Sequence, residues 1–167
     1  GKDALGANTT GSVNVAIANA LTANTTGESN IAIGSNSLND NTTGSQNVAV
    51  GRQALGDNTT ADNNTAVGYN ALKLSTTGDR NTSVGSLSLD ANTTGANNSA
   101  FGYASLGKNT TANDNAAFGN KSLEDNTSGQ YNTAVGSLSL RDSTTASNNT
   151  AIGYNSLGAN TTGTQNT

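Results

Sequence analysis

Apolar and polar residues recur along this chain with a period of 17. Each period carries an Asn, a short segment such as Thr-Ala-Val-Gly, and a Leu four residues after that Gly. The apolar positions lack the i, i+3, i+4, i+7 spacing of an amphipathic helix, whereas Val, Ile and Thr in short runs are typical of strands. The pattern therefore predicts an all-β fold in which each repeat forms one coil.

The repeat covers the whole chain. Its unit reads N-x-A-V-G-x-x-(A/S)-L-x-x-N-T-T-G-x-x, and about ten copies follow one another, one of them shorter by a residue between Ala18 and Leu21. We expect residues 1–167 to form a single repeat array, folded as a parallel β-solenoid or β-roll with one 17-residue coil per repeat. The backbones of successive coils would be hydrogen-bonded to each other, with a spacing of about 4.8 Å along the rod. Neither end shows a polar cap, which predicts a segment of a longer fibre.

Two columns of the array hardly vary, and we expect both to face inward as structural ladders. Stacked Asn side chains can donate to one neighbouring coil and accept from the other, which satisfies polar groups that would be costly to bury. The expected Asn ladder comprises Asn30, Asn47, Asn64, Asn81, Asn98, Asn115, Asn132 and Asn149. The expected Leu ladder comprises Leu38, Leu55, Leu72, Leu89, Leu106, Leu123, Leu140 and Leu157.

The two faces of the strand differ in side-chain size. Residues one and three after the Asn point the same way, as Val15 and Ile17 do, and we assign this face to the interior, with Phe101 and Phe118 in the same column. The opposite face is a row of small residues. We predict that this row packs against another chain, as a chain-chain interface formed by Ala32, Ala49, Ala66, Ala100, Ala117, Ala134 and Ala151.

A single coil cannot fold alone. Ordering 17 residues of backbone costs about 17 to 34 kcal/mol, whereas burying one Leu and one Val contributes about 3 to 6 kcal/mol. Contacts with neighbouring coils and with partner chains must supply the difference. We therefore expect a homo-oligomer, either a homotrimer or a filament.

Two glycine columns are expected to turn the backbone. One follows the strand, at Gly34 and its equivalents, and the other closes each Asn-Thr-Thr-Gly segment, as at Gly44. Glycine adopts positive φ without steric penalty, and both columns are predicted to use it.

Composition restricts the possible functions. The net charge of -4, with seven scattered basic residues, argues against nucleic acid as a partner, and no apolar run is long enough for membrane insertion. His and Cys are absent, so the Ser-His and Cys-His nucleophiles of many enzymes are excluded. The carboxylates fall at variable turn positions shared with Lys and Arg, which predicts a solvated rim. We expect no enzyme activity, no cofactor and no metal.

The repeated strings also show a family resemblance. Residues 64–72, NTAVGYNAL, and 149–157, NTAIGYNSL, each followed by a Thr-Thr-Gly turn, resemble the repeats of bacterial and phage fibre proteins. The segments Val15–Ala18 and Ile31–Gly34 also resemble the head repeats of trimeric autotransporter adhesins, although the period here is longer. This resemblance implies a β-roll of three chains in a surface appendage or virion tail fibre, with no binding residue carried over.

Several functions fit these expectations. The first is a structural shaft, located extracellularly, on a cell surface or on a virion. The alternative is an adhesin that binds a surface receptor through turn residues such as Tyr69, Tyr103 and Tyr154. A third is an ice-binding face built from stacked Thr. The repeated Asn-Thr-Thr segments match the acceptor pattern for N-glycosylation, but we assign them a structural role in the turn.

Overall fold

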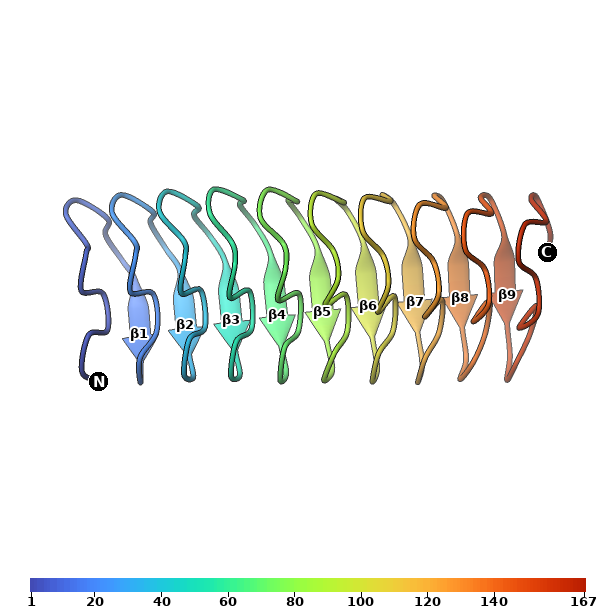
Figure 1. The fold of residues 1–167 in the computed structure, drawn as a ribbon, viewed down its shortest axis with the longest axis horizontal. Coiled ribbons are helices and arrows are strands. Elements are labelled where there is room, and N and C mark those ends of the chain that lie inside the picture. The colour runs from blue at the N-terminus through green and yellow to red at the C-terminus, as the bar shows by residue number, and fades with distance from the viewer.

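The computed structural model describes all residues 1–167 and shows a parallel β-solenoid (Figure 1). Nine three-residue strands stack in chain order into one sheet, and each coil returns through turns on the other sides of the rod. The strands are β1 (Val15–Ile17), β2 (Ile31–Ile33), β3 (Val48–Val50), β4 (Thr65–Val67), β5 (Thr82–Val84), β6 (Ser99–Phe101), β7 (Ala116–Phe118), β8 (Thr133–Val135) and β9 (Thr150–Ile152). The predicted all-β solenoid with 17-residue coils is confirmed.

Equivalent residues of successive coils lie directly beside each other. Ala49 pairs with Ala66, 17 residues later, and the same offset holds from β2 to β9. Between β1 and β2 the offset is 16, because Val15 pairs with Ile31. The missing residue is therefore absorbed in the turn after β1, and the strand register is preserved.

The apolar part of the interior consists of small and medium side chains. A cluster of 18 buried residues runs along the rod and combines the central Ala of seven strands with the Leu of the facing wall. Leu38 to Leu140 are fully buried, and Leu157 in the last coil is partly buried against the same core. The residue before each Leu, Ala or Ser, is also buried, as Ala71 and Ser88 illustrate. The Leu column thus lies where the sequence places it.

The strand faces are reversed with respect to the prediction. Val15 and Ile17 are 46% and 53% exposed, whereas the central alanines are buried within their own chain. The predicted chain-chain interface at Ala32, Ala49, Ala66, Ala100, Ala117, Ala134 and Ala151 is wrong, because none of these side chains reaches the surface. The assignment of Phe101 and Phe118 to the core is also wrong, since both lie on the outer side of the sheet.

The reason for the reversal is the narrow interior of a 17-residue coil. Across the core, the strand centre meets the small residue that precedes Leu. Where Ser83 replaces Ala at the strand centre, its hydroxyl contacts the hydroxyl of Ser88 directly. Only Ala or Ser fits on both sides of so short a gap, and the larger Val, Ile and Phe must point outward. A row of small residues therefore marks the interior here.

The backbone turns differ in part from the expected use of glycine. Gly after the strand has positive φ, for example +127° at Gly34 and +138° at Gly68, as predicted. The prediction is wrong for the Asn-Thr-Thr-Gly glycines, whose φ is not in this range. At Gly44 an added Cβ would instead press against the carbonyl oxygen of Ala61 in the next coil, so this column is small because of close approach. The Leu residues themselves adopt left-handed backbone, with φ of 47° at Leu38.

Candidate functional site

The first Asn column consists of the residue before each of the strands β2 to β9, from Asn30 to Asn149. These side chains are buried, and their hydrogen bonds hold the coil closed. The backbone N–H of Asn47 donates to Oδ1 of Asn30 at 3.0 Å, and Nδ2 of Asn47 donates to the carbonyl of Ala61 at 2.8 Å. Asn30 to Asn149 in this column are at most 1% exposed. Their main partners are backbone groups, so this column joins the strand to the turn that closes the same coil.

A second Asn column, in the Asn-Thr-Thr turns, forms an amide ladder in addition to the one predicted for the first column, in which Nδ2 of Asn132 donates to Oδ1 of Asn115 at 3.1 Å. Nδ2 of Asn41 donates to Oδ1 of Asn24 at 2.8 Å and to the carbonyl of Gly44 at 2.9 Å. The ladder is interrupted where Ser75 and Ser143 replace Asn, and both Ser hydroxyls are buried without a partner. Sequence alone shows the replacement but does not show that the position is buried.

Most of the Asn residues of the N-glycosylation motifs lie in the interior of the rod. Asn24, Asn41, Asn58, Asn92, Asn109 and Asn126 are fully buried. Their amide nitrogens donate to the turn carbonyl three residues later, as Asn109 does to Ala112 at 3.2 Å. A glycan on such a nitrogen would have to break this hydrogen bond and open the coil. The folded chain therefore uses these Asn residues as turn elements.

The two Thr columns have different environments. Oγ1 of Thr42 and the backbone N–H groups of Thr42 and Thr43 all donate to the carbonyl of Thr59 in the next coil. The first Thr of each turn is thus half-buried and engaged, and only the second is exposed. A flat ice-binding face needs two neighbouring exposed columns, so this arrangement gives the Thr-Thr segments no such face.

The outer side of the sheet carries no charge, and one of its two outward columns is entirely apolar. Its outer strand column, the third residue of each strand, contains only Ile, Val and Phe: Ile17, Ile33, Val50, Val67, Val84, Phe101, Phe118, Val135 and Ile152. Phe101 and Phe118 stack with ring centroids 4.9 Å apart and an angle of 7° between the rings. This surface was missed by sequence reasoning, although the unbroken apolar column was a usable signal.

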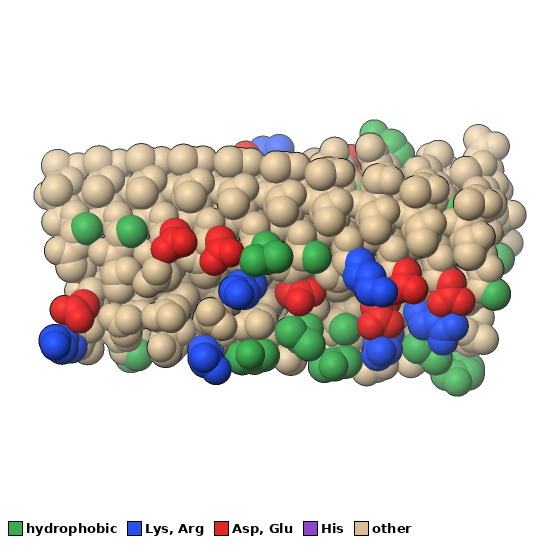
Figure 2. All heavy atoms as spheres, viewed as in Figure 1, with side chains coloured by type: hydrophobic (Ala, Val, Ile, Leu, Met, Phe, Trp, Pro, Cys, Tyr) green, Lys and Arg blue, Asp and Glu red, His purple; other side chains and the backbone are tan.

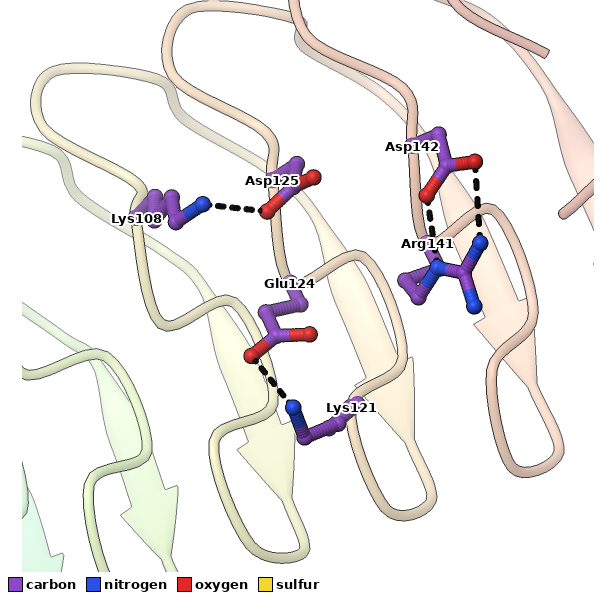
Figure 3. A network of polar contacts seen from close by, with 6 residues as sticks. All are labelled: Lys108, Lys121, Glu124, Asp125, Arg141 and Asp142. Carbon is purple, nitrogen blue, oxygen red and sulfur yellow. Dashed lines mark hydrogen bonds and ion pairs between the residues drawn. The ribbon is translucent and has the colours of Figure 1, made fainter. Parts of the chain in front are cut away.

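Charged side chains occupy the turns, as expected for a solvated rim. Figure 2 shows acidic and basic groups intermixed on one face of the rod. Lys108 Nζ lies 2.7 Å from Asp125 Oδ1 in the next coil, and Arg141 pairs with Asp142 (Figure 3). Hydrogen bonding to Arg141 lowers the pKa of Asp142, whereas partial burial raises the pKa of Asp90. These groups form pairs across or within coils and do not converge on a shared centre.

One hollow of about 350 Å³ opens on this rim beside Gly107. Gly107 interrupts the column that follows Leu, in which the neighbouring coils carry Asp90 and Glu124. The same column holds Gly56, which opens no such hollow, so a glycine at this position does not by itself predict one from the sequence.

No group of three or more Asp and Glu side chains lies close enough together to hold a metal ion. The structure contains no helix that could cross a membrane. Comparisons with protein-family models, curated proteins and solved structures found no match to this chain.

Proposed function

We propose that this chain is a non-enzymatic structural segment of a fibre, located outside the cell or on a virion, in which copies of the rod pack side by side. The observation that supports this proposal is the charge-free apolar strip formed by the outer strand column. Monomeric soluble proteins rarely expose long contiguous apolar surfaces, and such surfaces commonly mark contacts between proteins.

The strip has the dimensions of a lateral contact. Nine strands at about 4.8 Å per step extend over roughly 38 Å. In the first three strands both outward positions are Val or Ile, and in the later strands the first position is Thr, Ser or Ala. The partner proposed is another copy of this chain, because the rod is straight and repetitive and an identical strip matches it in length and spacing. A homotrimer is the assembly that the resemblance to adhesin head repeats favours.

Stiffness is the mechanical property that the fibre role requires. The Leu and Asn columns are continuous from coil to coil, and the backbone of each coil is bonded to its neighbour at several points around the section, including Leu38 to Ala54 at 3.0 Å and Thr42 to Thr59 at 2.9 Å. Bending the rod would therefore stretch hydrogen bonds on one side in every coil involved. This bonding around the whole section supports a shaft.

The proposal is tested by measuring the mass of the assembly by sedimentation equilibrium. We expect the wild-type chain to give a multiple of 16.5 kDa. Charges placed in the strip, Val50→Asp, Val84→Asp and Val135→Asp together, should give monomers with unchanged circular dichroism, because an unpaired charge is costly to bury in an interface. The matched control carries Thr60→Asp, Thr94→Asp and Thr145→Asp on the same coils, where the side chains are exposed outside the strip, and should assemble normally. A wild-type chain that stays monomeric contradicts the proposed packing.

Adhesion is a second candidate function, supported by the exposure of the aromatic turn residues. Tyr69, Tyr103 and Tyr154 occupy one column and are 45%, 47% and 77% exposed. Arg52 in the same column lies over the ring of Tyr69, 5.8 Å from its centroid. Replacing the three Tyr residues with Ser should abolish attachment to a receptor-bearing surface and leave the assembly mass unchanged. Unchanged attachment contradicts the adhesive role.

A further inference from the structure

The hollow beside Gly107 has a defined structural origin. Asp90, Gly107 and Glu124 are equivalent residues of three successive coils, each directly after the Leu of its coil. The absent side chain at Gly107 leaves a gap between the two carboxylate-bearing coils, and the gap has a volume of about 350 Å³. This is close to the lower end of the range of small-molecule sites, which is about 300 to 1,000 Å³. The space suits a ligand of one ring.

The walls of the hollow combine an aromatic ring with hydrogen-bonding groups of both kinds. Tyr103 and Leu87 supply apolar surface, and Asp90 and Glu124 supply carboxylate acceptors. Lys108 lines the same hollow and uses one of its three N–H groups on Asp125, at 2.7 Å. Partial burial raises the pKa of Asp90, so its carboxylate has lost part of its contact with water and gains from a neutral hydroxyl donor.

The charges around the hollow are already largely paired. Lys108 is bound to Asp125, and Glu124 is bound to Lys121 at 3.1 Å (Figure 3). A strongly charged ligand would have to displace one of these partners. An uncharged ligand rich in hydroxyls would bind without displacing them, since hydroxyls both donate and accept. Its ring face could stack on Tyr103, which is exposed on the rim.

We propose that the hollow between Asp90, Tyr103, Gly107 and Glu124 binds one uncharged sugar ring. This inference rests on the adhesive candidate function and names its ligand class. The carboxylates of Asp90 and Glu124 accept hydrogen bonds from sugar hydroxyls, the Lys108 ammonium donates one, and Tyr103 contacts the ring face. Such a site is individually weak, and a fibre containing several chains would present several copies of it, which raises the avidity for a sugar-coated surface.

A glycine elsewhere in the same column provides a matched control. Gly107 and Gly56 are both buried, and neither has a positive φ that would strain another residue. A Cβ would lie 3.2 Å from the nearest atom at Gly107 and 3.3 Å at Gly56. Thr already occupies this column at Thr22. Gly107→Thr should therefore fill the hollow, whereas Gly56→Thr changes the rod equally and leaves the hollow open.

The test is saturation-transfer NMR on the assembled protein with methyl glycosides of glucose, galactose, mannose and N-acetylglucosamine as probes. We expect transfer to the ring protons of at least one probe, with affinity reduced at least about tenfold in Gly107→Thr and in Tyr103→Ser, and unchanged in Gly56→Thr. Tyr103 is on the surface, so its substitution reports on binding even if Gly107→Thr perturbs the local coil.

Two results would overturn the inference. One is no saturation transfer to any probe from the wild-type assembly at millimolar sugar. The other is equal binding by the wild type and both hollow variants. Surface attachment measured in parallel separates this inference from the function on which it rests: a wild-type assembly that attaches to the surface and yet binds none of the sugar probes retains the adhesive role and lacks the sugar site proposed here.

Discussion

Oδ1 of Asn58 and Oγ of Ser75, in the same column of successive coils, are both buried and neither has a hydrogen-bond partner. In most coils this position is occupied by an Asn whose amide donates to the Asn of the preceding coil, as Asn58 does to Asn41 at 2.7 Å. Ser is too short to span the distance between coils. The break leaves an acceptor and a hydroxyl unsatisfied in the interior, which is unfavourable.

Restoring the amide at this break should stabilise the rod. In Ser75→Asn, the new Nδ2 can donate to Oδ1 of Asn58, and we expect the free energy of unfolding to rise by about 1 to 2 kcal/mol. Asn109→Ser introduces the reverse change, since it removes the amide that donates to Oδ1 of Asn92 at 2.9 Å, and should lower the free energy of unfolding by a similar amount. Urea unfolding followed by circular dichroism measures both. A loss of stability in Ser75→Asn would contradict the cost assigned to the two unsatisfied groups.

The inside-outside arrangement predicts very different costs at adjacent positions. Leu89→Ala removes a fully buried side chain and should lower the free energy of unfolding by about 2 to 5 kcal/mol. Asp90→Ser, on the rim, should change it by less than about 0.5 kcal/mol. Thermal and urea unfolding of the two variants provide the comparison. Similar losses in both would contradict the assignment of Leu to the core and Asp to the surface.

The glycine after each strand should not tolerate a side chain. In Gly68→Ala, the new Cβ would lie 2.6 Å from the carbonyl oxygen of Gly85, and the residue would have to keep a φ of +138°. We expect a loss of about 2 kcal/mol or more in the free energy of unfolding. Gly56→Ala is the control, since its φ is not positive and its Cβ contact is 3.3 Å. Equal effects at the two positions would show that the φ at Gly68 is not the cause.

Stability should depend on pH through Asp57. Partial burial raises its pKa despite the nearby Lys73, so the folded state holds this proton at pH values where the unfolded chain has released it. The resulting penalty is present at neutral pH and disappears as the pH falls through the raised pKa towards the ordinary carboxyl value. Asp57→Asn should therefore be more stable than the wild type at pH 7, and the difference should vanish in acid.

Asp142 provides a control of opposite sign for the same measurement. Its pKa is lowered by hydrogen bonding to Arg141, so its contribution is favourable at neutral pH and is lost as the pH falls through the lowered pKa. Asp142→Asn should be less stable than the wild type at pH 7 and equal to it in strong acid. Urea unfolding measured between pH 7 and about pH 2 tests both variants, because the lower limit lies below the ordinary carboxyl pKa. A pH dependence unchanged by Asp57→Asn contradicts the burial effect.

The sequence is sufficient to predict the architecture because the period is unbroken at most positions. The same residue types recur every 17 positions. This recurrence is enough to predict the coil length, the buried Leu and Asn columns and the turn at the glycine after the strand. The 16-residue unit near Ala18 is also located correctly, since β1 and β2 pair with an offset of 16. Repetition makes each conclusion rest on many copies of the same environment.

The choice between the two strand faces depends on a quantity that the period does not contain, the width of the coil. Hydrophobicity alone places Val15 and Ile17 inside and Ala16 outside, because larger apolar residues are usually buried. The interior of this coil is too narrow for them. The hollow at Gly107 was missed for a related reason: its walls come from three coils, and a single unit of the repeat shows only a glycine.

The 17-residue offset between bonded partners also governs how the chain reaches this structure. Each new coil needs to close a loop of only one period, and the entropy lost in closing a loop rises with its length. The edge of the last formed coil then acts as a template, with its donors and acceptors already in place for the next. Such a chain can fold progressively as it emerges during synthesis or export, because each coil pairs only with the coil formed just before it. Under tension the same rod should come apart by reversing these steps, one coil at a time.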